Sequence, residues 1–207
     1  MEDVLEVYQR PYNPMYPVVC LDESNRQLIE ETRTALPTKP GSCKKVDYEY
    51  RRKGVVDFFM MFEPLAGHRH VEICTSRKRE DFERCIQRLV DIYYPNCEKI
   101  VLVMDNFNTH SIASLYETFP PDEALRLAKK LEIHHTPKHG SWLDMAEIEI
   151  GVMSRQCLKG YLSDIDVVTS QVNTWCADRN ARAVSVNWQF TTADARIKLK
   201  SLYPVNH

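Results

Sequence analysis

Three acidic residues, Asp22, Asp105 and Glu147, have types and surroundings suited to metal-dependent chemistry. Asp105 directly follows the apolar run 100–104, which predicts a buried strand that delivers the acid to its solvent-facing tip. Asp22 follows the apolar run 17–21 in the same way, and Glu147 lies in the first two turns of an expected helix. Mg²⁺ takes oxygen ligands and is usually held by only a few protein carboxylates. The set therefore predicts a divalent-metal site.

Each acid also has a structural interpretation that involves no metal. Residues 22–25 have good turn chemistry, so Asp22 could cap a turn or a helix. Asp105 could form an Asx turn with the asparagines that follow it, and Glu147 could be an exposed helix acid. These alternatives stay open on the residues alone.

Two further acids lie close to Glu147 in the sequence. Asp144 is three residues earlier and shares its helix face, so it could be an auxiliary ligand, or simply an acid favoured at a helix N-terminus. Glu149 is rotated by about 200° from Glu147 and is expected to be structural.

The histidines and Trp142 suggest other roles near these acids. His110 and His139 are expected at the mouth of the site, where they could contact phosphate or orient ligands. A zinc site that includes His134 and His135 is disfavoured, because adjacent strand residues point to opposite faces and the chain has neither HExxH nor CxxC spacing. Trp142 could stack on a DNA base, but packing in the protein is favoured.

The elements that would position these residues alternate as in an α/β domain. Strands are expected at 18–21 with a continuation over 27–33, at 55–62, at 70–74, at 100–104 and at 133–135. Helices are expected from 76 to about 95, over 122–131, over 142–158 and from 163 onward. Ile92, Leu125 and Leu131 are among the apolar residues expected to face inward from these helices. A turn through Pro64 and Gly67 joins the second and third strands, which predicts antiparallel pairing there.

The composition is that of a globular domain inside a cell. The 207 residues are 43% hydrophobic and 27% charged, which suits one domain with a buried core. Seven cysteines without a CxxC pair indicate a reduced, cytosolic compartment. The acidic N-terminus does not resemble a signal peptide, and no apolar stretch approaches the ~20 residues that span a bilayer. Membrane association is therefore not expected.

Four sequence blocks resemble the catalytic domain of DDE transposases (DDE superfamily endonucleases), specifically the bacterial insertion-sequence relatives of mariner. They are Val18-Val19-Cys20-Leu21-Asp22-Glu23, Met104-Asp105-Asn106-Phe107-Asn108-Thr109-His110, His135-Thr136-Pro137-Lys138-His139-Gly140-Ser141-Trp142-Leu143 and Trp188-Gln189-Phe190-Thr191-Thr192-Ala193-Asp194-Ala195-Arg196. The resemblance implies an α/β, ribonuclease-H-like fold: a mixed five-stranded sheet flanked by helices. Two features depart from the family: 41 residues separate Asp105 from Glu147, and Asp144 stands where Asn is common.

The resemblance implies that Asp22, Asp105 and Glu147 are both the catalytic residues and the ligands of two Mg²⁺ or Mn²⁺ ions. The implied activity is cleavage of DNA strands and their transfer during DNA transposition. The implied partners are transposon ends and target DNA. A second copy of the chain could also take part, and the DNA-binding half could be encoded separately or be lost from a degraded copy. Residues 1–207 are expected to be one catalytic domain without an N-terminal helix-turn-helix, acting in the bacterial cytoplasm at the nucleoid.

Three alternatives remain open for the function. The chain could be a structure-selective nuclease or resolvase of the same fold, a non-catalytic remnant that binds DNA or a partner transposase, or a dimerisation subunit whose segment 184–190 crosses to a second copy. DNA binding by this chain alone is expected to be weak and non-specific. Its net charge is −2, its basic residues lie in short clusters, and affinity for DNA comes largely from Lys and Arg contacts to phosphates.

Overall fold

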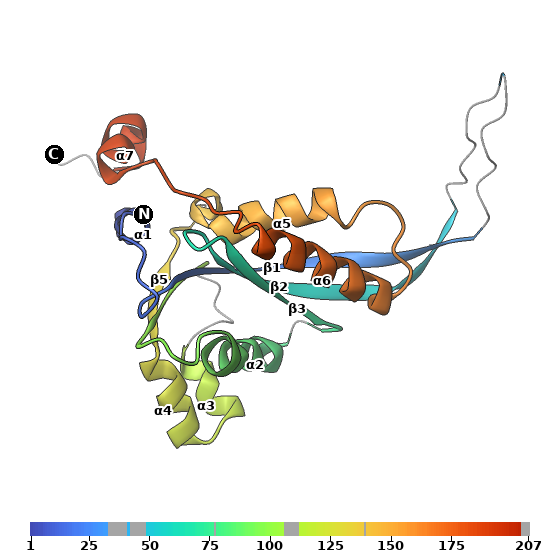
Figure 1. Ribbon diagram of the computed structural model, residues 1–207, viewed down its shortest axis with the longest axis horizontal. Helices are drawn as coiled ribbons and strands as arrows, with labels where there is room; N and C mark the ends of the chain where they lie inside the picture. Colours follow the sequence, from blue (N-terminus) through green and yellow to red (C-terminus); the bar gives the residue numbers. More distant parts are fainter. Residues whose placement is uncertain (33–40, 42–48, 77, 106–111, 139, 204–207) are drawn as a thin grey trace.

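The computed structural model describes residues 1–32, 41, 49–76, 78–105, 112–138 and 140–203. Its centre is a five-stranded sheet in the order β3-β2-β1-β4-β5 (Figure 1). The strands are β1 (Val18–Glu31), β2 (Tyr50–Glu63), β3 (His68–Cys74), β4 (Ile100–Met104) and β5 (Leu131–His135). β1, β2 and β3 pair antiparallel, whereas β4 pairs in parallel with both β1 and β5. The predicted mixed five-stranded sheet is confirmed.

Helices cover both faces of the sheet (Figure 1). One face carries α5 (Met145–Gln156) and α6 (Ile165–Ala181), and the other carries α2 (Arg79–Arg88), α3 (Leu115–Thr118) and α4 (Pro121–Lys129). Alternate residues of β1 serve the two cores: Cys20 packs under α5 and α6, whereas Val19 and Leu21 pack under α2 and α4. The strands that both layers cover are accordingly apolar, and every residue of β4 is buried.

Shorter elements complete the chain. They are α1 (Glu2–Tyr8), α7 (Thr192–Lys198), a π-helical turn at Leu89–Tyr93, and 3₁₀ turns at Ile112–Ser114, Ser141–Leu143 and Lys200–Leu202. α1 and α7 lie together at one end of the molecule (Figure 1). Neither was predicted, since seven residues are too few to show helical periodicity. A signal for α7 was nevertheless present, because Thr191 and Asp194 form a capping box.

Three predicted helix residues are placed differently by the structure. The predicted helix 76–95 is α2 followed by the π-helical turn, which rotates the apolar stripe and leaves Ile92 57% exposed. α4 ends at Lys129, and Leu131 opens β5 instead of continuing the helix. Leu125 is 43% exposed because Ala124 and Leu127 form the inward face of α4. The prediction that Ile92 and Leu125 face inward was wrong, and Leu131 is buried in a strand.

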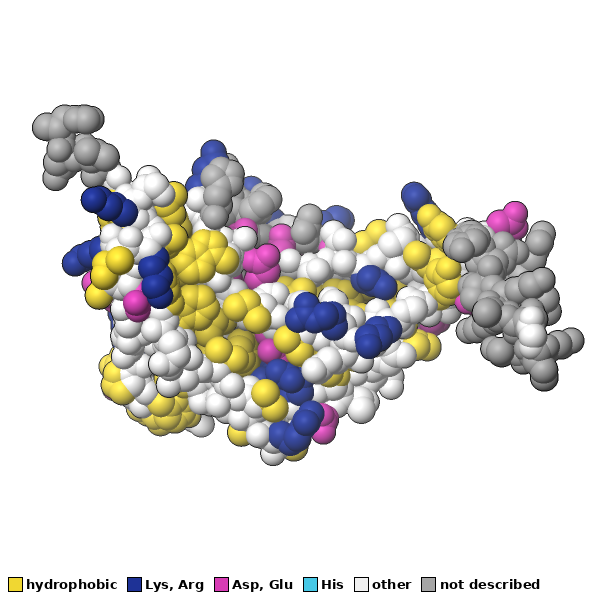
Figure 2. All heavy atoms as spheres, turned by 90° about the horizontal axis from the view of Figure 1, so that it is seen from above, with side chains coloured by type: hydrophobic (Ala, Val, Ile, Leu, Met, Phe, Trp, Pro, Cys, Tyr) yellow, Lys and Arg dark blue, Asp and Glu magenta, His cyan; other side chains and the backbone are white. Residues whose placement is uncertain are grey.

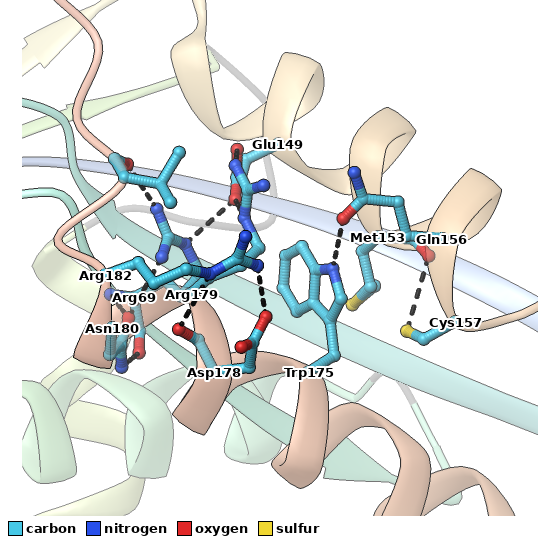
Figure 3. A network of polar contacts seen from close by, with 11 residues as sticks. Arg69, Glu149, Met153, Gln156, Cys157, Trp175, Asp178, Arg179, Asn180 and Arg182 are labelled. Carbon is cyan, nitrogen blue, oxygen red and sulfur yellow. Dashed lines mark hydrogen bonds and ion pairs between the residues drawn. The ribbon is translucent and has the colours of Figure 1, made fainter.

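A buried ion-pair network fastens α5 and α6 to the sheet (Figure 3). Glu149 of α5 accepts hydrogen bonds from Arg179 of α6 at 2.8 and 3.2 Å. Oε1 of Glu149 also lies 2.8 Å from Nε of Arg69 in β3. This contact is an ion pair, although Nε of Arg69 makes no hydrogen bond. The other Arg69 nitrogens donate to Asn180 Oδ1 and to the Val184 carbonyl. The prediction that Glu149 is structural is confirmed.

The segment after α6 packs on its own chain. The Val186 amide donates to the Pro64 carbonyl oxygen at 2.8 Å, and the Trp188 ring lies 5.4 Å from the ring of Tyr8. Gly67, in the turn between β2 and β3, has a φ of +65°, and a Cβ there would lie 2.5 Å from the Ala183 backbone. This segment therefore closes over the β2–β3 turn and α1. Within the described residues, no helix is both long and apolar enough to cross a bilayer.

Candidate active site

Asp22 and Asp105 lie on neighbouring strands at the same level of the sheet. β1 and β4 pair in parallel, and the last pair in their register joins Leu21 to Met104. The next residue on each side is an acid, Asp22 within β1 and Asp105 immediately after β4. Both acids follow apolar residues that are buried between two helical layers. The parallel register therefore brings two carboxylates together from positions far apart in the sequence.

Asp22 does not lie at a strand tip, and that part of the prediction was wrong. β1 continues to Glu31 as the antiparallel partner of β2, with Asp22 opposite Met60. The pairing of β1 with β4 ends at Leu21. Asp22 is therefore the first residue of β1 beyond that pairing. The alternative in which Asp22 caps a turn or helix is also wrong, because the residue is part of a regular strand.

Glu147 reaches the same region from the first turn of α5. The helix begins at Met145 and not at Trp142, because Asp144 is its N-cap. Asp144 Oδ1 accepts a hydrogen bond from the Ala146 amide at 2.8 Å. The helix-start interpretation of Asp144 is therefore confirmed.

A hydrogen bond from the N-terminal helix α1 fixes the turn before α5. Tyr8 of α1 donates a hydrogen bond from its hydroxyl to the Leu143 carbonyl oxygen at 2.6 Å. Burial raises the pKa of this phenol far above its usual range, so it stays protonated and remains a donor. α1 thus holds the 3₁₀ turn that sets the start of α5.

One cavity of about 430 Å³ joins all three predicted acids. Its lining residues are Asp22, Glu23, Ser24, Asp105, Ser141, Asp144, Glu147, Ile150 and Gly151. The structure therefore brings Asp22, Asp105 and Glu147 together, with Asp144 beside them. Sequence reasoning missed Ser24 and Gly151, although both follow from simple periodicity. Ser24 is two residues from Asp22 along a strand, and Gly151 is four residues from Glu147 along a helix.

Burial and the neighbouring acids disfavour the charged forms of Asp22 and Asp144. Burial raises the pKa of Asp22 to about 6, and the charges of Asp105 and Glu147 add to the shift, against a hydrogen bond from the Glu23 amide. Burial raises the pKa of Asp144 well above its usual range, and the charge of Asp22 raises it further. Several carboxylates sharing one cavity without a cation are therefore held at an electrostatic cost.

The chemistry of the cavity fits a hard divalent cation. Its charged lining groups are carboxylates, and Oδ2 of Asp144 is buried without a hydrogen-bond partner. Over the described part of the chain, no three His, Cys, Asp or Glu side chains form a group able to hold a metal ion. The acids thus surround the cavity without closing on one point.

The predicted auxiliary histidines, His110 and His139, lie outside the described residues. His134 is engaged elsewhere, with Nδ1 2.8 Å from Asp3 Oδ2 and Nε2 3.0 Å from Glu132 Oε1. His135 lies closer to the site, and its Nδ1 is 3.2 Å from the Asp105 carbonyl oxygen. His135 therefore contacts the backbone that presents Asp105.

Trp142 lies between two residues that line the cavity, Ser141 and Asp144. Its ring stacks on Trp188 with centroids 6.3 Å apart and meets the ring of Phe190 edge-on at 5.9 Å. The packing favoured from the sequence is present, and 41% of Trp142 remains exposed. Figure 2 shows the hydrophobic surface between α7 and the start of α5.

Asp22→Asn is expected to stabilise the metal-free protein. A raised carboxyl pKa means that ionisation opposes folding, so stability falls as the pH rises from about 4 to about 6 and stays lower above that. At pH 7.5 the neutral amide should raise the free energy of unfolding by roughly 1–3 kcal/mol, measured by urea denaturation in EDTA. Adding Mg²⁺ should stabilise the wild type and not the variant. A variant less stable than wild type in EDTA would contradict this account of the cavity.

Comparisons with known proteins agree with the fold. The family model "DDE superfamily endonuclease" matches residues 17–169. The crystal structure of the Mos1 mariner paired end complex with Mn has a TM-score of 0.58 at 14% identity, covering 87% of this chain and 55% of that one. The Mos1 strand transfer complex gives a TM-score of 0.59 at 14% identity, with coverages of 87% and 54%. No curated protein matches the chain.

The chain spans about half the length of the Mos1 transposase in those complexes. It covers 81% of the isolated catalytic domain of Mos1 mariner transposase, with a TM-score of 0.53 at 13% identity. The implied ribonuclease-H-like fold is therefore confirmed. The family model covers most of the chain, and Asp22 and Asp105 lie directly after the last residues at which β1 pairs with β4. This protein therefore belongs to the DDE superfamily endonucleases.

Proposed function

We propose that this chain is the catalytic domain of a DNA transposase, which cleaves DNA strands and joins them to a target. The observation that carries the proposal is the single cavity lined by Asp22, Asp105 and Glu147. These three residues come from β1, the end of β4 and α5, and they stand at the positions that the family resemblance assigns to its catalytic acids.

In this proposal the acids hold two Mg²⁺ or Mn²⁺ ions. Such a pair activates a water molecule or a DNA 3′-hydroxyl and stabilises the leaving oxygen of the phosphodiester. Asp22 would contact both ions, while Asp105 and Glu147 would each complete the ligand set of one.

The remaining groups of the site position these acids. Asp144 sets the first turn of α5 through its bond to the Ala146 amide, and its free oxygen faces the same acidic surroundings as an auxiliary group. His135 bonds to the backbone that carries Asp105. The protein thus contributes a fixed frame of carboxylates, and no side chain needs to form a covalent intermediate.

The DNA substrates in this proposal are transposon ends and target DNA. Residues 1–207 act as one catalytic domain that works together with a second copy of the chain, and sequence-specific recognition of transposon ends comes from a separate DNA-binding half. The isolated chain should then bind DNA weakly and with steep salt dependence, near the non-specific range of roughly 10⁻⁴ to 10⁻⁶ M.

A strand-transfer assay tests the proposal. A precleaved end with a free 3′-hydroxyl is incubated with supercoiled plasmid, the chain and Mn²⁺. We expect joined products that depend on the 3′-hydroxyl and disappear in EDTA. Cleavage without joining would favour a nuclease or resolvase. Neither cleavage nor joining, with DNA binding intact, would favour a non-catalytic remnant.

A further inference from the structure

The acidic cavity lies between β1 and α5, and the surface along these two elements from the cavity to Arg26 and Arg155 is called the groove. The two elements run side by side in the same direction (Figure 1). At the near end, Asp22 and Glu147 line the cavity; at the far end, the Ile29 amide donates to the Leu162 carbonyl oxygen at 2.8 Å. Between these anchors, Ser24 of β1 lines the cavity on the strand side.

Arg26 lies along the strand side of this groove. Residues at even positions of β1 face α5 and α6, as the buried Cys20 and Leu28 show. Arg26 is paired with Val56 of β2, which is fully buried in the same core and so points to the same face. Four strand residues at roughly 3.3 Å each place Arg26 about 13 Å beyond Asp22.

Arg155 occupies the matching position on the helix side. It follows Glu147 by eight residues, which is about 12 Å at 1.5 Å per residue. Its side chain folds back along α5 toward the acids and lies over Gly151. A Cβ on Gly151 would be 3.3 Å from Nη1 and 3.7 Å from Nη2 of Arg155. The missing side chain at Gly151 leaves room for the guanidinium against the cavity wall.

Neither arginine has a carboxylate partner among the residues that the structure describes. Other arginines of the chain do, including Arg126 with Asp91 and Arg196 with Glu2, each at 2.8 Å or less. A guanidinium without a carboxylate partner keeps its donors available for an anion such as a phosphate. Figure 2 shows the face of the molecule that carries α5 and α6. Acidic side chains lie beside the hydrophobic surface near α7, and Lys and Arg side chains lie over α5 and α6.

We propose that Arg26 and Arg155 form a phosphate-binding site that holds the DNA strand next to the phosphodiester at the acids. The inference rests on the proposed function, and it adds a site that the acids do not supply. The acidic cavity repels a phosphodiester unless cations fill it, whereas each of the two arginines, farther along the groove, attracts a phosphate farther along the same strand. The groove thus has a reacting end and an anchoring end.

Salt dependence of DNA binding tests this site without measuring cleavage. Binding of a fluorescent DNA duplex of arbitrary sequence is measured by anisotropy over a salt series, with Ca²⁺ in the buffer. Each phosphate contact contributes about 0.9 to the slope of log K against log[salt], so Arg26→Gln and Arg155→Gln should each lower the slope by about 0.9 and the double variant by about twice that. Arg155→Lys keeps the charge and should keep most of the slope.

Arg84→Gln is the matched control, because Arg84 is exposed on α2, across the sheet from the groove. It should leave the slope unchanged. A double variant with the wild-type slope, an equal loss in Arg84→Gln, or a wild-type chain that does not bind DNA would each overturn the site. A lowered slope in a chain that never cleaves DNA would instead count against the proposed function alone.

Discussion

Asp105→Asn is expected to abolish metal-dependent DNA cleavage while leaving the fold intact. The residue follows a fully buried strand, and its side chain lines the cavity with Asp22 and Glu147. An amide keeps the size of the carboxylate and removes the charge that would hold a metal ion. Losing an ion that stabilises charge in the transition state should lower the rate by at least about a thousandfold. Cleavage of labelled DNA in Mg²⁺ or Mn²⁺ measures the effect.

The control for this variant is Asp122→Asn. Asp122 is exposed in the first turn of α4, on the face of the sheet opposite α5, so cleavage should be unaffected. Circular dichroism and urea unfolding would verify that both proteins fold. Undiminished cleavage by a folded Asp105→Asn variant would exclude Asp105 as a metal ligand.

The sheet was predictable because its signals are local. The run Ile100–Met104 is apolar at every position, as a strand covered on both faces must be, and the turn at Pro64 and Gly67 marks the hairpin of β2 and β3. The length of β1 was not predictable in the same way. Beyond Leu21 the strand is polar and half-buried, and it is extended because β2 pairs with it, which is a tertiary effect.

The acids were predictable as a set, but their arrangement was not. Their residue types and the resemblance to a family singled out Asp22, Asp105 and Glu147, and the cavity now places them together. The parallel register of β1 and β4, which puts the two aspartates at one level, depends on strand order and cannot be read from either strand alone. The same is true of Arg69, whose partners on α5 and α6 lie far away in the sequence.

Glu149→Ala is expected to destabilise the protein by roughly 3–5 kcal/mol, because it leaves two buried guanidinium groups without a counter-charge. The Arg69 side chain is fully buried, and the Arg179 side chain is only 10% exposed. Burial lowers the pKa of Arg69, and the charge of Glu149 opposes that shift. Urea unfolding of the variant and the wild type measures the change.

A triple variant distinguishes the effect of the lost counter-charge on stability from the effect of lost packing contacts. Replacing all three charged residues by apolar ones, as in Arg69→Met/Glu149→Leu/Arg179→Met, removes the unpaired charges and should recover much of the stability lost by Glu149→Ala. Both arginines also lie over the Trp175 ring, at 5.9 and 5.3 Å, so the triple variant keeps an apolar neighbour at each position (Figure 3). A triple variant as unstable as the single one would show that packing, not charge, makes Glu149 necessary.

Glu147→Gln provides the comparison within the same helix. Glu147 lies two residues from Glu149 but lines the acidic cavity, where its charge helps to raise the pKa of Asp22. Its neutralisation should leave the free energy of unfolding unchanged or raise it, and should abolish cleavage. Glu149→Ala should do the reverse, with cleavage per folded molecule retained. If both variants lowered stability equally, the two faces of α5 would not have the separate electrostatic roles that their contacts indicate.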